Sequence, residues 1–142
     1  MQRINYEEML QGSHLTNKSG ILKDAEKILN DKCLYAAVPH CSYYSCLQLM
    51  KHIWIHTLGN TEVELESQCS IAKTGSHKVL INNIGSYIKE KNTEDFRKFN
   101  PKISQLKRLR IDSDYKDILC DSSMSAKSMH LSNEIIPILK KY

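Results

Sequence analysis

The stretch PHCSYYSCLQLMKHIWIHTL, residues 39–58, is the longest continuous helical pattern in this chain. Pro39 is a residue favoured in a first helical turn, and Gly59 follows the last apolar position. Apolar residues spaced three or four apart fall on one face of a helix, and this face carries Tyr43, Cys46, Leu47, Met50, Trp54 and Leu58. Because the segment holds the only tryptophan, we expect it to be the central packing element.

Similar patterns predict further helices on both sides of this segment. Ser19 is a plausible N-cap for a helix over 20–33, and Ser76 for a helix over 77–90. Two more helices are expected over 102–114 and 123–140, the last of them with Pro137 near its end.

The segments between these helices lack a sustained apolar stripe. Residues 1–18 are expected to be a weakly ordered N-terminal extension, in which Gly12 breaks any short helix. Residues 60–75 are polar and favour a loop. A turn over 93–99 should be interrupted at Asn100-Pro101, because proline lacks the N–H that a helix interior needs.

No stretch alternates apolar and polar residues long enough to predict a strand. The sequence therefore predicts an all-α fold, an antiparallel up-and-down bundle of about five helices over residues 19–142. A chain of 142 residues suits one domain, and 41% apolar with 25% charged residues is a globular composition.

Cysteine usage and hydropathy bear on the cellular compartment. Five cysteines form an odd set without CxxC spacing, which favours reduced thiols. No apolar run approaches the roughly 18 residues of a membrane span, and no apolar segment of a leader follows the first residues. We expect a cytoplasmic protein that does not engage a membrane.

Positive charge gathers late in the chain. Residues 97–116 contain seven lysines and arginines against two aspartates, while the whole chain has a net charge of +4. Such a concentration would attract a phosphate-bearing partner, although a solvated helix face has the same composition.

Inside this basic stretch, the sequence Leu106-Lys-Arg-Leu-Arg-Ile-Asp-Ser-Asp-Tyr115 places two arginines before an Asp-Tyr pair. Arg110 and Asp114 share a helix face and could form a surface ion pair, with Tyr115 packed on a neighbouring helix. Alternatively, Arg108, Arg110, Asp114 and Tyr115 contact a ligand, since arginine offers a fork for phosphate and tyrosine a stacking face.

Together with Ala25-Glu-Lys-Ile-Leu29 and Tyr43-Tyr-Ser-Cys-Leu-Gln-Leu49, this motif resembles the HEPN superfamily. The resemblance implies a small helical bundle that binds nucleotides or RNA, often in prokaryotic toxin–antitoxin and defence modules. It also implies a homodimer and a nucleotidyltransferase-like partner protein. A homodimer is favoured as well by the apolar and aromatic residues on several faces of one helix, Tyr44, Trp54 and Ile55.

The resemblance departs from the ribonuclease members at one position. Those proteins carry a histidine a few residues after the motif arginine, and Ser113 stands there if Arg108 is that arginine. A serine hydroxyl is no general base near neutral pH without a separate activator. We therefore expect a non-catalytic binding module. A ribonuclease toxin that uses Arg110, Tyr115 and His77, and a purely protein-binding bundle, remain as alternatives.

Histidines elsewhere supply secondary candidates. His77 and Lys78 also resemble this HEPN branch and begin a predicted helix, whose free N–H groups favour an anion, although His77 also continues an apolar stripe. His52 and His56 lie one turn apart, yet no glutamate or third ligand accompanies them, so a polar edge is favoured over a metal site. We expect neither a metal nor a cofactor.

Overall fold

The computed structural model describes the backbone of residues 6–142 and the side chains of residues 14–142. Within that part of the chain the fold is entirely helical, as predicted. Its six α-helices are α1 (Tyr6–Asp31), α2 (Val38–His52), α3 (Glu62–Ala72), α4 (Ser76–Lys91), α5 (Thr93–Tyr115) and α6 (Ser122–Leu139). A 3₁₀ turn, η1 (Tyr35–Ala37), precedes α2, and a π-helical turn, η2 (Ile53–Thr57), follows it.

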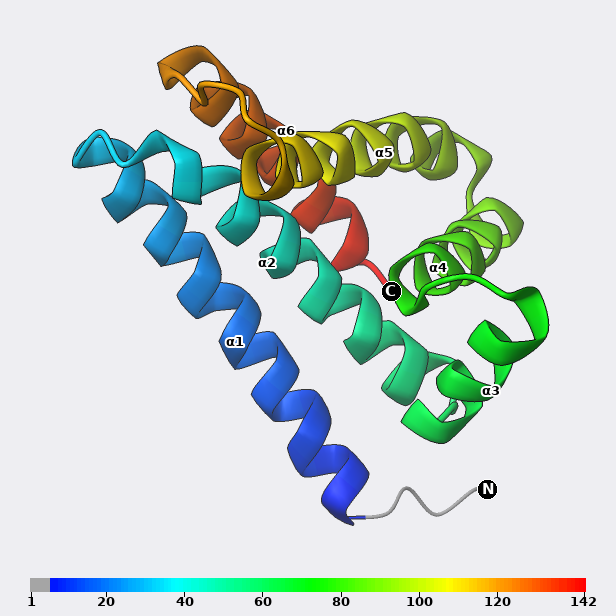
Figure 1. The fold of residues 1–142 in the computed structure, drawn as a ribbon. Helices are drawn as coiled ribbons and strands as arrows, with labels where there is room; N and C mark the ends of the chain where they lie inside the picture. The colour runs from blue at the N-terminus through cyan, green and yellow to red at the C-terminus, as the bar shows by residue number, and fades with distance from the viewer. Residues whose placement is uncertain (1–5) are drawn as a thin grey trace.

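Helix α2 lies at the centre of the bundle and packs against α1, α5, α6 and α4. Figure 1 shows α1 and α2 as a hairpin of two long helices, with α5 and α6 on the other side of α2. The predicted stripe forms the core, since Tyr43, Cys46, Met50 and Trp54 are at most 1% exposed. Trp54 and Ile55 are both buried within the bundle, so neither provides the exposed helix face that was expected to favour a dimer.

The first helix begins earlier than predicted. Helix α1 runs without a break from Tyr6, so Ser19 is not an N-cap. The weakly ordered extension expected over residues 1–18 is therefore wrong for residues 6–18, which are helical. Ser19 is buried and donates its hydroxyl hydrogen to the Ser45 carbonyl oxygen at 2.7 Å, and Leu15 joins the core. A helical glycine costs only about 1 kcal/mol, which packing along α2 offsets. The part of the extension over residues 1–5 lies outside the described residues.

Helix α3 occupies the segment predicted as a loop. Its N-terminus is a capping box, in which Thr61 and Glu64 each accept a hydrogen bond from the other's backbone N–H. This box satisfies two of the donors that a helix start leaves unpaired. Leu65 alone among the residues of α3 is buried, which explains why an apolar stripe did not reveal the helix.

Helix α5 is continuous through Pro101, so the predicted interruption at Asn100-Pro101 is wrong. Proline removes one backbone hydrogen bond and crowds the preceding turn, at a cost of about 3 kcal/mol. Phe99, Ile103 and Leu106 lie on both sides of it and are fully buried, which offsets this cost. The continuous helix carries Arg110 to the first turns of α2, where its guanidinium lies over the Tyr43 ring.

The remaining helices agree with the predictions within a few residues. Helix α4 begins at Ser76, but its N-cap is Gly75, and α6 continues through Pro137 to Leu139. No helix in residues 6–142 has both the length and the apolar character needed to cross a bilayer.

Candidate functional site

Arg110 is the central residue of the candidate site. It projects from α5, and only 6% of it is exposed. Its guanidinium carbon lies 5.0 Å from the ring centre of Tyr43, 5.5 Å from that of Tyr44 and 5.7 Å from that of Tyr115. A cation over aromatic faces at such distances is stabilised by the ring quadrupoles, more strongly where water is excluded. Three tyrosines therefore help to offset this buried charge.

His77, at the start of α4, lies beside the same guanidinium. Its Nδ1 atom is 3.1 Å from the Tyr43 hydroxyl oxygen and 3.5 Å from Nη2 of Arg110. Arginine can only donate, so Nδ1 is the acceptor in its contact with Arg110. Burial raises the pKa of the Tyr43 phenol, which therefore keeps a proton that it can donate to the same atom. The ring proton of neutral His77 accordingly sits on Nε2. We call Arg110, His77, Tyr43, Tyr44 and Tyr115 the Arg110 cluster.

The protonation state of His77 follows from its surroundings. Burial lowers the pKa of His77, and the positive charges of Arg110, Lys107 and Lys51 lower this pKa further. All of these effects oppose a second positive charge on the ring. His77 is therefore neutral near pH 7.

Asp114 belongs to the edge of the cluster rather than to a close pair with Arg110. Its Oδ2 atom accepts a hydrogen bond from Nδ1 of His40 at 2.9 Å and stands 4.0 Å from Nη1 of Arg110. The His40 ring in turn packs on Tyr44, with 4.5 Å between ring centres. The expected i,i+4 ion pair is thus present only at long range, and Asp114 is shared with a histidine from α2.

The environment of the Arg110 cluster is strongly positive. Burial lowers the pKa of Lys107, and the positive charges of Arg110 and Lys78 lower it further. The Nε atom of Arg110 is buried, and no hydrogen-bond partner exists for it among the described residues. An unpaired buried donor beside several cations suits an anion, because the anion would supply both the missing acceptor and the opposite charge.

Other predicted site residues lie apart from the cluster or have structural roles. Arg108 is exposed and lines a hollow of about 270 Å³ whose other lining residues are Ser104, Lys107, Ile111, Asp112 and Lys116. Ser113 donates its hydroxyl hydrogen to the Ala36 carbonyl oxygen at 2.6 Å, which ties the end of α5 to η1. Lys78 is exposed at the start of α4.

The structural interpretation of the motif, a surface ion pair with a packed tyrosine, is wrong in both parts. Arg110 is buried, so it does not belong to a surface ion pair. Tyr115 is 75% exposed, so its ring is not packed on a neighbouring helix, as the structural alternative required. His40 and Tyr44 reach the site without having been predicted there. The paired tyrosines of α2 were the available signal, but their spacing alone is typical of core residues.

His52, the last residue of α2, and His56, in η2, lie side by side. The rings of His52 and His56 stack with 4.8 Å between their centres. Within the described part of the chain, no three His, Cys, Asp or Glu residues are grouped in a way that could hold a metal ion.

Comparison with known proteins returned no relative of this chain: no protein-family model, no curated protein and no solved structure matches it.

Proposed function

We propose that this protein is a HEPN-like module that binds a nucleotide or RNA at the Arg110 cluster without cleaving it. The proposal places the protein in a toxin–antitoxin or defence system, as a homodimer with a nucleotidyltransferase-like partner protein. The observation that carries it is the buried Arg110 guanidinium, enclosed by tyrosines and left with an unpaired Nε atom. A buried charge is normally paired, so an arginine with a purely structural role would not be expected to keep an unpaired donor. A bound anion would pair it.

The chemistry around Arg110 matches both parts of a nucleotide. A phosphate oxygen could accept from the guanidinium, while the positive charges of Lys78 and Lys107 add attraction over a longer range. The exposed ring of Tyr115 offers a face on which a base could stack. These features support a single-stranded ligand whose bases are accessible.

The state of the nearby side chains supports binding without cleavage. The Ser113 hydroxyl donates its hydrogen to the Ala36 carbonyl oxygen. The free lone pair of neutral His77 lies on Nδ1, where Tyr43 and Arg110 already donate to it. General-base catalysis would require these bonds to break before the histidine could take a proton.

A metal-independent ribonuclease is the second candidate function. The observation that favours it is the distance of 3.5 Å between His77 and Arg110, since imidazole is the usual general base near neutral pH. A purely protein-binding bundle is the third candidate, favoured by Ile118 and Leu119, which are 49% and 85% exposed just beyond Tyr115.

Binding is tested with matched arginine variants. Fluorescence anisotropy would follow a labelled single-stranded RNA of about ten nucleotides, with adenosine monophosphate as competitor. Arg110→Lys keeps the charge but loses the planar fork, so affinity should fall about tenfold or more. Arg108→Lys, the same change on the exposed face of α5, should alter affinity less than twofold. Equal effects of the two substitutions, or no binding by the wild type, would reject the proposal.

Cleavage is tested on the same RNA in the presence of a metal chelator. We expect the purified protein to leave the RNA intact over hours. Cleavage that disappears in both Arg110→Lys and His77→Asn, while Arg108→Lys keeps it, would replace the binding module with the ribonuclease. Circular dichroism of each variant checks that the fold is retained.

A further inference from the structure

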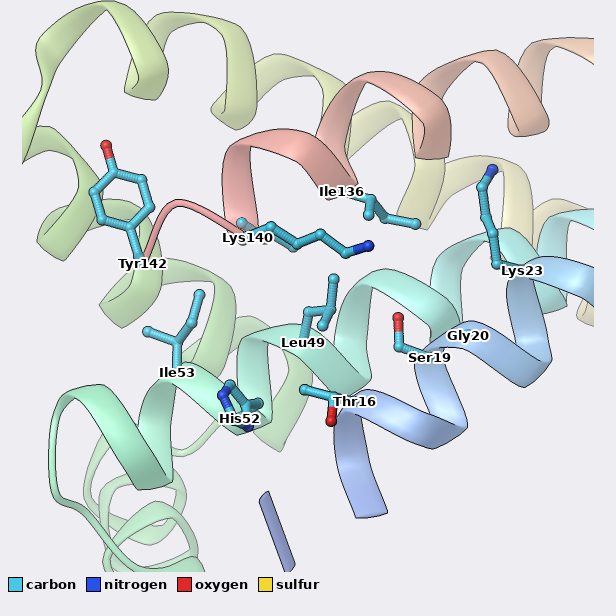
Figure 2. A pocket seen from close by; sticks show the side chains of 11 residues that line it. Thr16, Ser19, Gly20, Lys23, Leu49, His52, Ile53, Ile136, Lys140 and Tyr142 are labelled. Carbon is cyan, nitrogen blue, oxygen red and sulfur yellow. The ribbon is translucent and has the colours of Figure 1, made fainter. Parts of the chain in front are cut away.

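A second cavity lies away from the Arg110 cluster, between α1, α2 and α6. Its volume is about 340 Å³, the space that roughly eleven water molecules occupy in the liquid. Small-molecule sites in proteins begin at about this size. Figure 2 shows its lining side chains, which are Thr16, Ser19, Gly20, Lys23, Leu49, His52, Ile53, Ile136, Leu139, Lys140 and Tyr142.

The floor of this cavity is apolar. Leu49 comes from α2 and Ile53 from η2, while Ile136 and Leu139 come from α6, and all four are at most 8% exposed. Their side chains belong to the core, so this surface is held in place by the bundle itself. A rigid apolar wall favours a hydrocarbon group over a fully polar ligand.

Two lysines on opposite walls differ in the charge that they can offer. The Lys23 ammonium forms an ion pair with Glu26, which is 1% exposed, and donates to the Ser132 hydroxyl oxygen at 2.8 Å. Lys140 extends along the cavity from α6 (Figure 2), and no ion pair involves it among residues 14–142. The cavity therefore presents one uncompensated positive charge next to an apolar floor.

We propose that this cavity binds a small amphipathic monoanion, a carboxylate with a short aliphatic chain, with its head at Lys140 and its chain over Leu49, Ile53, Ile136 and Leu139. One free cation matches one negative charge, whereas a phosphate ester with two charges would leave one of them unpaired. A charge-assisted hydrogen bond to the ammonium fixes the orientation, and burial of the chain supplies the apolar contact. This site is independent of the Arg110 cluster and of the ligand proposed there.

Gly20 provides a way to fill the cavity without weakening the fold. It lines the cavity from α1, and a Cβ atom built on it meets no heavy atom within 4 Å. Gly20→Leu therefore adds bulk where there is open space. It also replaces glycine inside a helix by a strong helix former, which favours the folded state.

The experiment is a calorimetric titration of the full chain with sodium octanoate, and with 1-octanol as the uncharged counterpart. Octanoate should bind to the wild type, and Gly20→Leu should abolish the binding of both probes. Lys140→Met keeps the apolar stem and removes the charge, so it should weaken octanoate at least about fivefold and leave octanol unchanged. Lys127→Met is the matched control, because Lys127 is exposed on the same helix and the change in net charge is the same.

Each outcome has a defined meaning. Octanoate binding that depends on Gly20 and Lys140, but not on Lys127, supports the site. Absence of octanoate binding to the wild type overturns the proposal. Unchanged octanoate binding in Gly20→Leu or in Lys140→Met overturns it as well, and equal weakening by Lys127→Met would mean that the overall charge attracts the probe. A thermal melt of Gly20→Leu at or above the wild-type midpoint excludes unfolding as the reason for lost binding.

Discussion

The burial of Arg110 changes what a substitution at this position would measure. The side chain contacts three tyrosine rings and stands at long range from Asp114. Removing it would leave a cavity beside Tyr43 and Tyr44 and would eliminate the cation–π contacts. Arg110→Ala would therefore lower both ligand affinity and stability. For this reason Arg110→Lys is the more informative variant.

His77 gives the protein a pH-dependent stability that can be measured. The folded state holds the pKa of His77 below its ordinary value of 6.5, so the unfolded chain binds this proton more readily. Well above pH 6.5 the residue is neutral in both states and its titration does not change the free energy of unfolding. As the pH falls below 6.5, the unfolded state gains protons first, and the free energy of unfolding decreases.

Urea titrations at pH 7.5 and pH 5.5 check this expectation. The wild type should lose more stability between the two values than His77→Asn, which has no proton to bind at this position. An equal loss in both proteins would show that other groups cause the pH dependence.

At the scale of single elements, local capping decides whether a marginal helix forms. Helix α3 buries only Leu65, so tertiary packing contributes little to it. Its capping box at Thr61 and Glu64 supplies the missing stabilisation, and the backbone carbonyl of Thr61 also accepts a hydrogen bond from Nε1 of Trp54 at 2.9 Å. The start of α3 is thus fixed both locally and against the core.

Thr61→Ala should destabilise α3 by about 1 kcal/mol, because the cap loses its side-chain acceptor. Native-state hydrogen exchange would detect this as opening of α3 about fivefold more often, with little change in α2. Thr61→Ser retains the hydroxyl and should exchange like the wild type. Faster exchange throughout the whole chain in Thr61→Ala would show instead that α3 unfolds only together with the core.

At the scale of the whole molecule, one buried carboxylate joins three helices. Glu26 of α1 accepts hydrogen bonds from Ser42 of α2 and from Ser132 of α6, the latter at 3.0 Å, and forms an ion pair with Lys23. Glu26 is 1% exposed, so its charge depends on these partners. The network fixes the positions of the helices relative to one another.

Glu26→Ala should lower the free energy of unfolding by about 3 kcal/mol, since it removes the carboxylate that pairs with Lys23 and accepts hydrogen bonds from two buried serines. Denaturant unfolding followed by circular dichroism measures the loss. Asp24→Ala removes an exposed acid from the same helix and should change stability by no more than about 0.5 kcal/mol. Similar losses in the two variants would mean that net charge, rather than the buried network, accounts for the effect.

The assembly state is a separate prediction at this scale. We expect a two-fold homodimer, because closed pairs are the commonest oligomers and because Ile118 and Leu119 are exposed near the Arg110 cluster. Sedimentation at micromolar concentration should give a mass near twice 16.4 kDa. Leu119→Lys should shift the equilibrium toward the monomer. A single species near 16.4 kDa in the wild type would contradict the expectation.

The sequence by itself determined the helical class and the central role of α2. Apolar periodicity is a local property, and a stripe such as Tyr43, Cys46, Met50 and Trp54 has to be buried wherever the other helices lie. Apolar periodicity was insufficient where the cost of a helix-breaking residue is similar in size to the free energy gained by packing. Gly12 and Pro101 weaken a helix by amounts that packing can offset. Helix α3 has no apolar stripe and is stabilised by its capping box instead.

Only the tertiary structure decided the geometry of the candidate site. Tyr43, His77 and Arg110 come from three different helices, and no sequence spacing relates them. The burial of Arg110, the neutral state of His77 and the exposure of Arg108 all depend on how α5 crosses α2 and α4. These properties arise from the desolvation and mutual distances of charged groups, which exist only once the helices are packed.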